Sequence, residues 1–278
     1  MPRNINEKLI VRLTLEDLVP LLNYIKTETK RLRLEVRQAG KFFVYYKKCK
    51  ILDVGINNYY IDEKYFENNQ KPKNIKELII NNPQLYFKDT ILVVDRWLTR
   101  HPKAEFVTQQ NIASENQDIN DRYIILDMEY NFSQSGIIAE ERVKKAGFDL
   151  LGIERKTGKI VFFEVKKGLK ALNGKAGIKT HILDFEECLY GKHKVEFRNS
   201  LIEDVKCILS DKNRLGLIDN FNLPLNLTAN DVELIFVFER GSCDQDDYLK
   251  IYNTEHRKSR STRTFRTIYV TNTYFKLR

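Results

Sequence analysis

The sequence predicts an α/β protein of the α+β type, with a mixed central β-sheet flanked by helices and a smaller β-rich unit before it. Short runs of alternating apolar residues fill much of the first 72 residues. Strand-like segments, then helix-like segments, then strand-like segments follow. Hydrophobic residues make up 42% and charged residues 31% of the 278 residues, which is typical of a globular chain. We therefore expect a β-rich accessory domain over 1–72 and a larger domain over 75–278.

The N-terminal unit is interpreted as a strand, a helix and a β-meander. KLIVRLT (8–14) has the composition of a strand, and a helix is expected to open near Thr14, which precedes two acidic side chains. Alternating apolar residues from Leu32, a turn at Ala39-Gly40 and the aromatic run 42–46 predict the meander, which 57–66 continues. The polar, Pro-containing stretch 67–74 is a plausible linker.

The larger domain is expected to alternate between helices and strands. Helical spacing of apolar residues predicts a helix over 82–99. Residues 135–147 fit either a short amphipathic helix or a loop running into a strand that begins near Arg142. Two further helices and three further strands follow from composition and periodicity: helices over 179–191 and 197–213, and strands over 122–132, 232–240 and 266–277.

Residues 146–168, AGFDLLGIERKTGKIVFFEVKKG, predict a β-hairpin that carries charged residues among apolar ones. Side chains in a strand alternate between its two faces. One face of the second strand therefore presents Ile160, Phe162, Glu164 and Lys166, and one face of the first presents Asp149, Leu151 and Ile153. Gly158 can take the positive φ that a tight turn requires.

Two turn registers are compatible with this hairpin. With Lys156 and Thr157 at the centre of the turn, Asp149 faces Glu164; with Thr157 and Gly158 there, it faces Lys166. Both registers put the three charged groups on one face, where two carboxylates repel each other unless a cation cancels their charge. Mg²⁺ takes such oxygen ligands and activates water for attack on a phosphodiester, so the pattern indicates a metal site for phosphodiester hydrolysis.

The residues GFD at 147–149 and EVK at 164–166 resemble the signature of the PD-(D/E)xK nuclease superfamily. The resemblance implies a restriction endonuclease-like fold and Mg²⁺- or Mn²⁺-dependent cleavage, most naturally of DNA, in restriction, phage defence or DNA repair. It implies that Asp149 and Glu164 bind the metal with the Val165 carbonyl, and that Lys166 serves the attacking water. Phe148 replaces the signature Pro, and His181 and Phe185 stand where many relatives have Gln and Tyr.

A further acid is expected to join this site as both a metal ligand and a catalytic residue. Tyr123, Ile125, Asp127 and Glu129 alternate along a strand, and some branches of the superfamily have a similar LDIE-like strand. This match favours Glu129. Three alternatives remain open: Glu105, Glu140 and Glu141.

Two basic stretches are candidate nucleic-acid contacts. The segment 166–179 and the segment 256–266, both interpreted as loops, place many cations among small residues. The candidate phosphate-binding residues are Lys167, Lys170, Lys175, Arg257, Lys258, Arg260 and Arg263. A solvated basic loop is the alternative for each.

Charge and motif content narrow the function classes. The formal net charge of +9 and a pI of about 9.2 favour acidic partners such as nucleic acid. No secretory signal and no long apolar run is found, so a cytoplasmic protein without a membrane partner is expected. P-loop, Rossmann and GxSxG motifs are absent. A non-catalytic nucleic-acid-binding or assembly protein with the same fold is the competing class, and a homodimer is left open.

Overall fold

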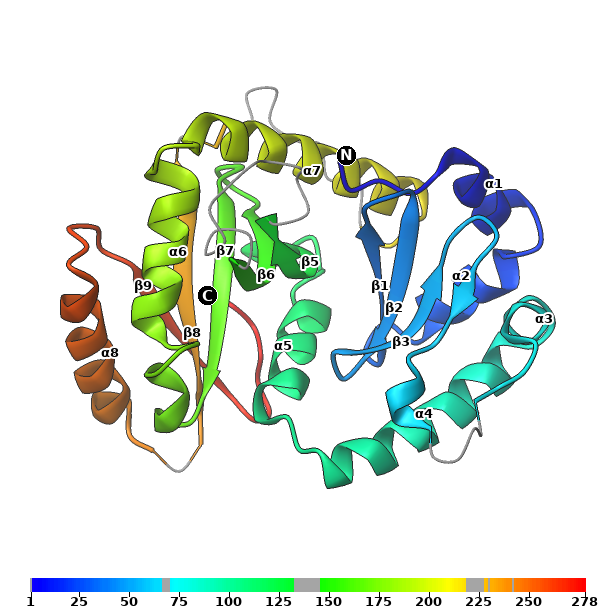
Figure 1. The fold of residues 1–278 in the computed structure, drawn as a ribbon, viewed down its shortest axis with the longest axis horizontal. Coiled ribbons are helices and arrows are strands. Elements are labelled where there is room, and N and C mark those ends of the chain that lie inside the picture. Colours follow the sequence, from blue (N-terminus) through cyan, green and yellow to red (C-terminus); the bar gives the residue numbers. More distant parts are fainter. Residues whose placement is uncertain (1, 67–70, 133–145, 219–227, 230, 242) are drawn as a thin grey trace.

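The computed structural model describes residues 2–66, 71–132, 146–218, 228–229, 231–241 and 243–278. These residues form eight α-helices, a four-stranded antiparallel sheet and a five-stranded mixed sheet. Figure 1 shows the smaller sheet on one side of the molecule and the larger one on the other, with α7 running between them. The predicted α+β class, with its mixed sheet, helices and preceding β-rich unit, is confirmed.

The N-terminal sheet has the strand order β1-β2-β3-β4, and each neighbouring pair is antiparallel. Its strands are β1 (Leu32–Arg37), β2 (Lys41–Tyr46), β3 (Cys49–Val54) and β4 (Tyr59–Tyr60). The predicted meander is therefore confirmed, although little of 57–66 is strand. Its apolar face, which includes Leu34, Val36 and Phe42, lies in the same core as residues of α1 and α2.

The strand predicted at 8–14 is wrong, because α1 (Glu7–Leu15) is a helix there. Asn6 caps it by accepting a hydrogen bond from the Lys8 N–H, and Leu9, Ile10 and Leu13 are buried on one side. The helix expected to open near Thr14 starts later, as α2 (Val19–Thr27), with a Pro in its first turn.

Two helices beyond the predicted linker also pack on the N-terminal sheet. They are α3 (Ile75–Asn81) and α4 (Pro83–Arg100), of which α4 confirms the helix predicted over 82–99. The Phe87 ring of α4 stacks on Tyr24 at 5.6 Å, and the Tyr86 hydroxyl donates to the Ile51 carbonyl at 2.7 Å. The predicted boundary between the two domains, at 72–75, stays a prediction. Helix α4 follows that boundary in the sequence but packs on residues that precede it.

The larger sheet has the order β5-β6-β7-β8-β9, antiparallel from β5 to β7 and parallel from β7 to β9. Its strands are β5 (Tyr123–Asn131), β6 (Gly147–Glu154), β7 (Ile160–Lys167), β8 (Glu233–Arg240) and β9 (Arg266–Thr271). All five were predicted, but β9 ends at Thr271 where a strand to 277 was expected. Residues 275–277 instead bond to the Asn116 side chain at the end of α5.

Helices cover both faces of this sheet. On one face lies α5 (Ala104–Glu115), and on the other lie α6 (Ile178–Tyr190), α7 (Lys194–Arg214) and α8 (Gln245–Ser259). The sequence predicted α6 and α7 but not α5 or α8. In the part of the chain that the structure describes, no helix has both the length and the apolar character needed to span a bilayer.

The two sheets meet through a buried polar layer. The second face of β1 presents Arg33, Glu35 and Arg37 toward β5, and Arg37 donates to the Met128 carbonyl at 2.8 Å. Lys212 of α7 donates to Glu35 at 2.6 Å. Arg3 pairs with Asp127, and its backbone N–H donates to Asp204 at 2.8 Å. This layer holds the face of the N-terminal sheet against the edge of the larger one.

Candidate active site

The β6–β7 hairpin has the first of the two predicted registers. Leu150 pairs with Phe163 and Ile153 with Ile160, so the next positions outward are Asp149 and Glu164. The turn is longer than the two residues expected: the Glu154 N–H donates to the Lys159 carbonyl at 2.9 Å, which leaves four residues in the loop. Gly158 has a φ of +72° there. The predicted turn length is wrong, and of the two registers left open the one that pairs Asp149 with Glu164 is observed.

The predicted alternation along the hairpin is also observed. Ile160, Phe162 and Leu151 lie in the core beneath α6 and α7, whereas Val161, Phe163 and Val165 lie in the core beneath α5. Glu164 and Lys166 share the face of Ile160 and Phe162. The alternation along β7 thus puts Glu164 and Lys166 on one side of the sheet, and the register puts Asp149 opposite Glu164.

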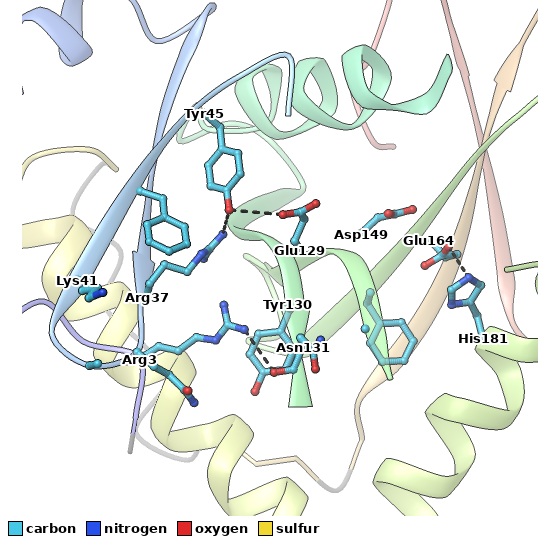
Figure 2. A pocket seen from close by; sticks show the side chains of 15 residues that line it. Arg3, Arg37, Lys41, Tyr45, Glu129, Tyr130, Asn131, Asp149, Glu164 and His181 are labelled. Carbon is cyan, nitrogen blue, oxygen red and sulfur yellow. Dashed lines mark hydrogen bonds and ion pairs between the residues drawn. The ribbon is translucent and has the colours of Figure 1, made fainter. Parts of the chain in front are cut away.

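Glu164 is the centre of this cluster. Its Oε1 accepts a hydrogen bond from the Lys166 Nζ at 2.6 Å and lies 2.8 Å from the His181 Nε2. Asp149 Oδ2 accepts from the Val165 N–H at 2.9 Å, just beyond the last backbone pair of the two strands. Figure 2 shows Asp149, Glu164 and His181 together at one side of a cleft.

Burial and neighbouring charges together set the protonation of these groups. Burial opposes the ionised form of Glu164, but His181 and Lys166 outweigh it and lower the pKa of Glu164 to about 2. Burial and the Glu164 carboxylate raise the pKa of Asp149. Burial works against the charged forms of Lys166 and His181, yet Glu164 raises the pKa of both. The cluster therefore holds Glu164 as a carboxylate between Lys166 and His181.

Lys48 is a site residue that sequence reasoning missed. Its Nζ lies 3.1 Å from Asp149 Oδ1 and 3.7 Å from Glu129 Oε1, and its side chain is only 7% exposed. Burial disfavours its charged form, but Asp149 and Glu129 raise the pKa of Lys48 above its usual value. The N-terminal sheet therefore contributes a cation to a site built mainly by the larger sheet.

A strained turn delivers Lys48 to the site. Lys47 and Lys48 connect β2 to β3 and both have positive φ, +47° and +57°, as in a type I′ turn. Each non-glycine residue in this conformation costs about 1–2 kcal/mol. Gln110 of α5 offsets part of this cost by accepting a hydrogen bond from the Lys48 N–H at 2.7 Å.

Glu129 also reaches the site, through an unusual backbone. It lies between Met128 and Tyr130, which pair with Leu150 and Phe148, so Asp149 is its counterpart on β6. Its φ is +60°, and its side chain is 45% exposed. Its carboxylate accepts a hydrogen bond from the Tyr45 hydroxyl at 3.4 Å.

The alternation predicted along β5 is wrong beyond Ile125. The pairing with β6 shifts between Ile125 and Asp127, which is a β-bulge. Tyr123 and Ile125 therefore share a core with Met128, while Asp127 is fully buried against Arg3 and Arg37. Glu129 reaches the site by its positive φ and not by simple alternation.

The alternatives for the further acid are only partly described by the structure. Glu105 lies in the first turn of α5 and accepts a hydrogen bond from the Lys167 N–H at 3.4 Å. Burial raises the pKa of Glu105, and Lys166 opposes the effect. Glu140 and Glu141 fall outside the described residues, as does most of the ambiguous segment 135–147.

The donor set fits a hard cation that keeps part of its water shell. Glu164 Oε2 is buried without a hydrogen-bond partner among the described residues. The Glu164 carboxylate is also close enough to Asp149 to raise the pKa of Asp149. Within the described ranges, no group of three or more His, Cys, Asp and Glu side chains is arranged to hold a metal ion. Two carboxylates and a backbone carbonyl are nevertheless a sufficient protein contribution for Mg²⁺.

The predicted phosphate-binding residues do not form one cluster. Lys167 pairs with the buried Glu239 at 2.8 Å, on the opposite face of β7 from Lys166. Lys170 and Lys175 are exposed between β7 and α6.

The second basic stretch is partly helical, contrary to the loop that was expected. Arg257 and Lys258 lie in the last turn of α8, and Arg260 caps it with a φ of +60°. The Arg263 guanidinium lies 3.4 Å from the centre of the Tyr190 ring, at the C-terminal end of α6. His181 is nine residues earlier on that helix, about 13 Å away along its axis. The contact of Arg263 is therefore away from the carboxylates.

A cleft of about 670 Å³ opens in front of the carboxylates. Glu129, Asp149, Glu164 and His181 line one wall. The hairpin of β1 and β2 forms the facing wall with Arg37, Lys41 and Tyr45 (Figure 2), and Phe43 of β2 also lines the cleft. An acidic wall thus faces a basic and aromatic one.

Comparison with known protein families, with curated proteins and with solved structures finds no match to this chain.

Proposed function

We propose that this protein is a metal-dependent nuclease of the PD-(D/E)xK type, with a restriction endonuclease-like core, that hydrolyses phosphodiester bonds in nucleic acid, DNA in the first place. The observation that carries the proposal is the arrangement of Asp149, Glu164 and Lys166 on one face of the β6–β7 hairpin, at the wall of an open cleft. The orphaned Glu164 Oε2 supports a cation there. The mixed sheet with helices on both faces is consistent with the resemblance.

Each residue has a distinct role in this proposal. Asp149 and Glu164, with the Val165 carbonyl, hold a divalent cation, which when bound lowers the pKa of a coordinated water and stabilises charge on the phosphoryl oxygens. Lys166 orients the attacking water and offsets negative charge in the transition state. His181 holds the Glu164 carboxylate in place through Oε1, leaving Oε2 for the cation. Glu129 faces the same cleft and adds a further carboxylate.

The decisive test is cleavage of plasmid DNA and of a matched RNA by the wild type, Asp149→Ala and Lys166→Ala. We expect cleavage with Mg²⁺ or Mn²⁺, none with EDTA, and a loss of at least about 10²-fold in both variants. Asp231→Asn is the matched control, because that carboxylate is 76% exposed and pairs with Lys159, at the other end of β7 from Glu164 and Lys166. Full activity in both site variants, with folding verified by circular dichroism, would contradict the proposal.

A non-catalytic nucleic-acid-binding protein with the same fold is the second candidate. It is favoured by the contacts at the site, because Lys48 pairs with Asp149, and Lys166 and His181 bond to Glu164, without a metal. Calorimetric titration with Mn²⁺ separates the two. The nuclease requires binding that Asp149→Ala abolishes, whereas the binding protein requires nucleic-acid affinity and no metal affinity.

A further inference from the structure

The exposed face of the N-terminal sheet carries alternating aromatic and cationic side chains that lead away from the cleft. The Phe43 ring lies 5.5 Å from the Arg37 guanidinium carbon and 4.5 Å from the Lys50 ammonium nitrogen. The Tyr60 ring lies 5.6 Å from the same Lys50 nitrogen and 4.5 Å from that of Lys71. We call the set Lys41, Phe43, Lys50, Tyr60 and Lys71 the lysine–aromatic track.

The track lies on the face of the N-terminal sheet that packs against the larger sheet at β1 and becomes exposed to solvent toward β4. At β1 the face is buried by the contacts of Arg33, Glu35 and Arg37 with β5 and α7. At β2 and β3 the side chains of Phe43 and Lys50 are half-buried, and at β4 Tyr60 is 40% exposed. Its first members, Lys41 and Phe43, line the cleft opposite the carboxylates. The track therefore begins at the candidate active site and continues into solvent.

The cations of the track are available to a ligand. Lys41 has no ion-pair or hydrogen-bond partner among the described residues. Lys50 pairs with Asp53 at 3.3 Å and Lys71 with Glu63 at 2.9 Å. Both pairs are partly exposed to solvent, where ion pairs are weak, so a phosphate can replace the carboxylate.

We propose that the lysine–aromatic track binds a single strand of nucleic acid and leads it into the cleft. Single-strand sites combine lysines that follow the phosphates with aromatic rings on which bases stack. A duplex turns the faces of its bases inward, so Phe43 and Tyr60 would have nothing to stack on. The cleft, at about 670 Å³, has the size of a small-ligand site and admits a few nucleotides. Binding of a single strand by the track does not require nuclease activity; only the cleavage that would follow binding rests on the proposed function.

The test is fluorescence anisotropy with labelled oligothymidylate, oligouridylate and a DNA duplex, all in EDTA so that no cleavage occurs. We expect the single strands to bind more tightly than the duplex. Tyr60→Ala and Phe43→Ala should each weaken single-strand binding about tenfold, and Phe43→Trp should restore it, because one stacked base contributes about that much. Lys41→Ala should lower the salt dependence by about one counterion.

Matched controls distinguish the track from a general basic surface. Tyr274→Ala removes a ring that is also 40% exposed, and Lys206→Ala removes an exposed lysine of α7. Equal affinity for duplex and single strand, equal competition by heparin, or an effect of Tyr60→Ala no larger than that of Tyr274→Ala would overturn the track. Because Tyr60 is exposed, its variant remains informative if Phe43→Ala fails to fold. If the variants of Lys41, Phe43 and Tyr60 cleave DNA as well as the wild type does, the proposed role of the track is refuted, whereas the proposed nuclease activity is not.

Discussion

The charge at the candidate site is balanced by a residue from a separate sheet. Lys48 lies against both Asp149 and Glu129, and its strained turn is fixed by Gln110. Backbone strain that the surroundings hold in place is a common property of functional positions. In the absence of a metal, this ammonium group keeps two like-charged carboxylates side by side.

Replacing Lys48 by Met should strengthen the binding of Mn²⁺. The ammonium group repels a divalent cation near Asp149, so its removal should lower the dissociation constant at least about tenfold. Calorimetry of Mn²⁺ binding measures this directly. Lys48→Arg keeps the charge and is the matched control. Weaker or unchanged binding by Lys48→Met would show that Lys48 does not compete with the metal.

The residues of the site differ in how far the sequence could predict them. Glu164 and Lys166 were predictable because alternation in a buried strand determines which side chains share a face, and Asp149 was predictable from the register of the hairpin. Lys48 was not, because only tertiary contacts bring the β2–β3 turn to Asp149. Glu129 was chosen by resemblance. The bulge after Ile125 and the positive φ of Glu129 could not be predicted from the alternation of side chains in the sequence.

At the scale of elements, the β1–β2 turn has a residue poorly suited to its backbone. Ala39 and Gly40 have φ of +59° and +70°, the left-handed region, which Asn adopts more readily than Ala does. Ala39 is exposed, so its side chain adds no packing that would offset the strain. The turn lies at the rim of the cleft.

Ala39→Asn should therefore stabilise the protein. We expect the free energy of unfolding to rise by about 1 kcal/mol and the melting temperature by about 2 °C. Gly40→Ala should have the opposite effect, because its Cβ would lie 2.9 Å from the Asn6 Cβ at a positive φ. Thermal unfolding followed by circular dichroism compares the two, and a lower melting temperature for Ala39→Asn would contradict this reading of the turn.

Elements were predictable where burial follows a regular period. The strands of both sheets and the helices α4, α6 and α7 have that property. Helix α5 does not, because it buries Thr108, Gln109 and Gln110 between the sheets, and polar residues carry no hydrophobic period. In α1, the short apolar run fitted a strand as well as a helix, and its true class is set by the Asn6 cap and by packing.

At the scale of the whole molecule, a charged layer joins the two sheets. Lys212 of α7 and Arg33 both bond to Glu35 of β1, and all three are buried. Removing one member of such a network leaves the others unpaired, so the layer favours one arrangement of the sheets over others.

This layer should make stability depend on pH in the alkaline range. Burial, against the attraction of Glu35, lowers the pKa of Lys212 to about 8. Between pH 8 and about 10.4, the value of a lysine in an unfolded chain, the unfolded state binds more protons, so stability rises with pH. The rise from this group amounts to about 3 kcal/mol.

Urea unfolding across that range tests the effect. The free energy of unfolding of the wild type should rise relative to that of Lys212→Met, which lacks the titrating group. Lys206→Met, an exposed lysine of the same helix, should remain parallel to the wild type. Parallel curves for all three proteins would show that Lys212 titrates normally.

The contacts of the N-terminal segment also order events during synthesis. Arg3 and Ile5 hydrogen-bond to Asp204 and Asp211, which follow them by 201 and 206 positions. At about 5–20 residues per second, a ribosome takes roughly 10–40 s to reach those partners. Until then Arg3, which lines the cleft, lacks its partner Asp204, so this part of the cleft wall is completed only after both aspartates have been translated.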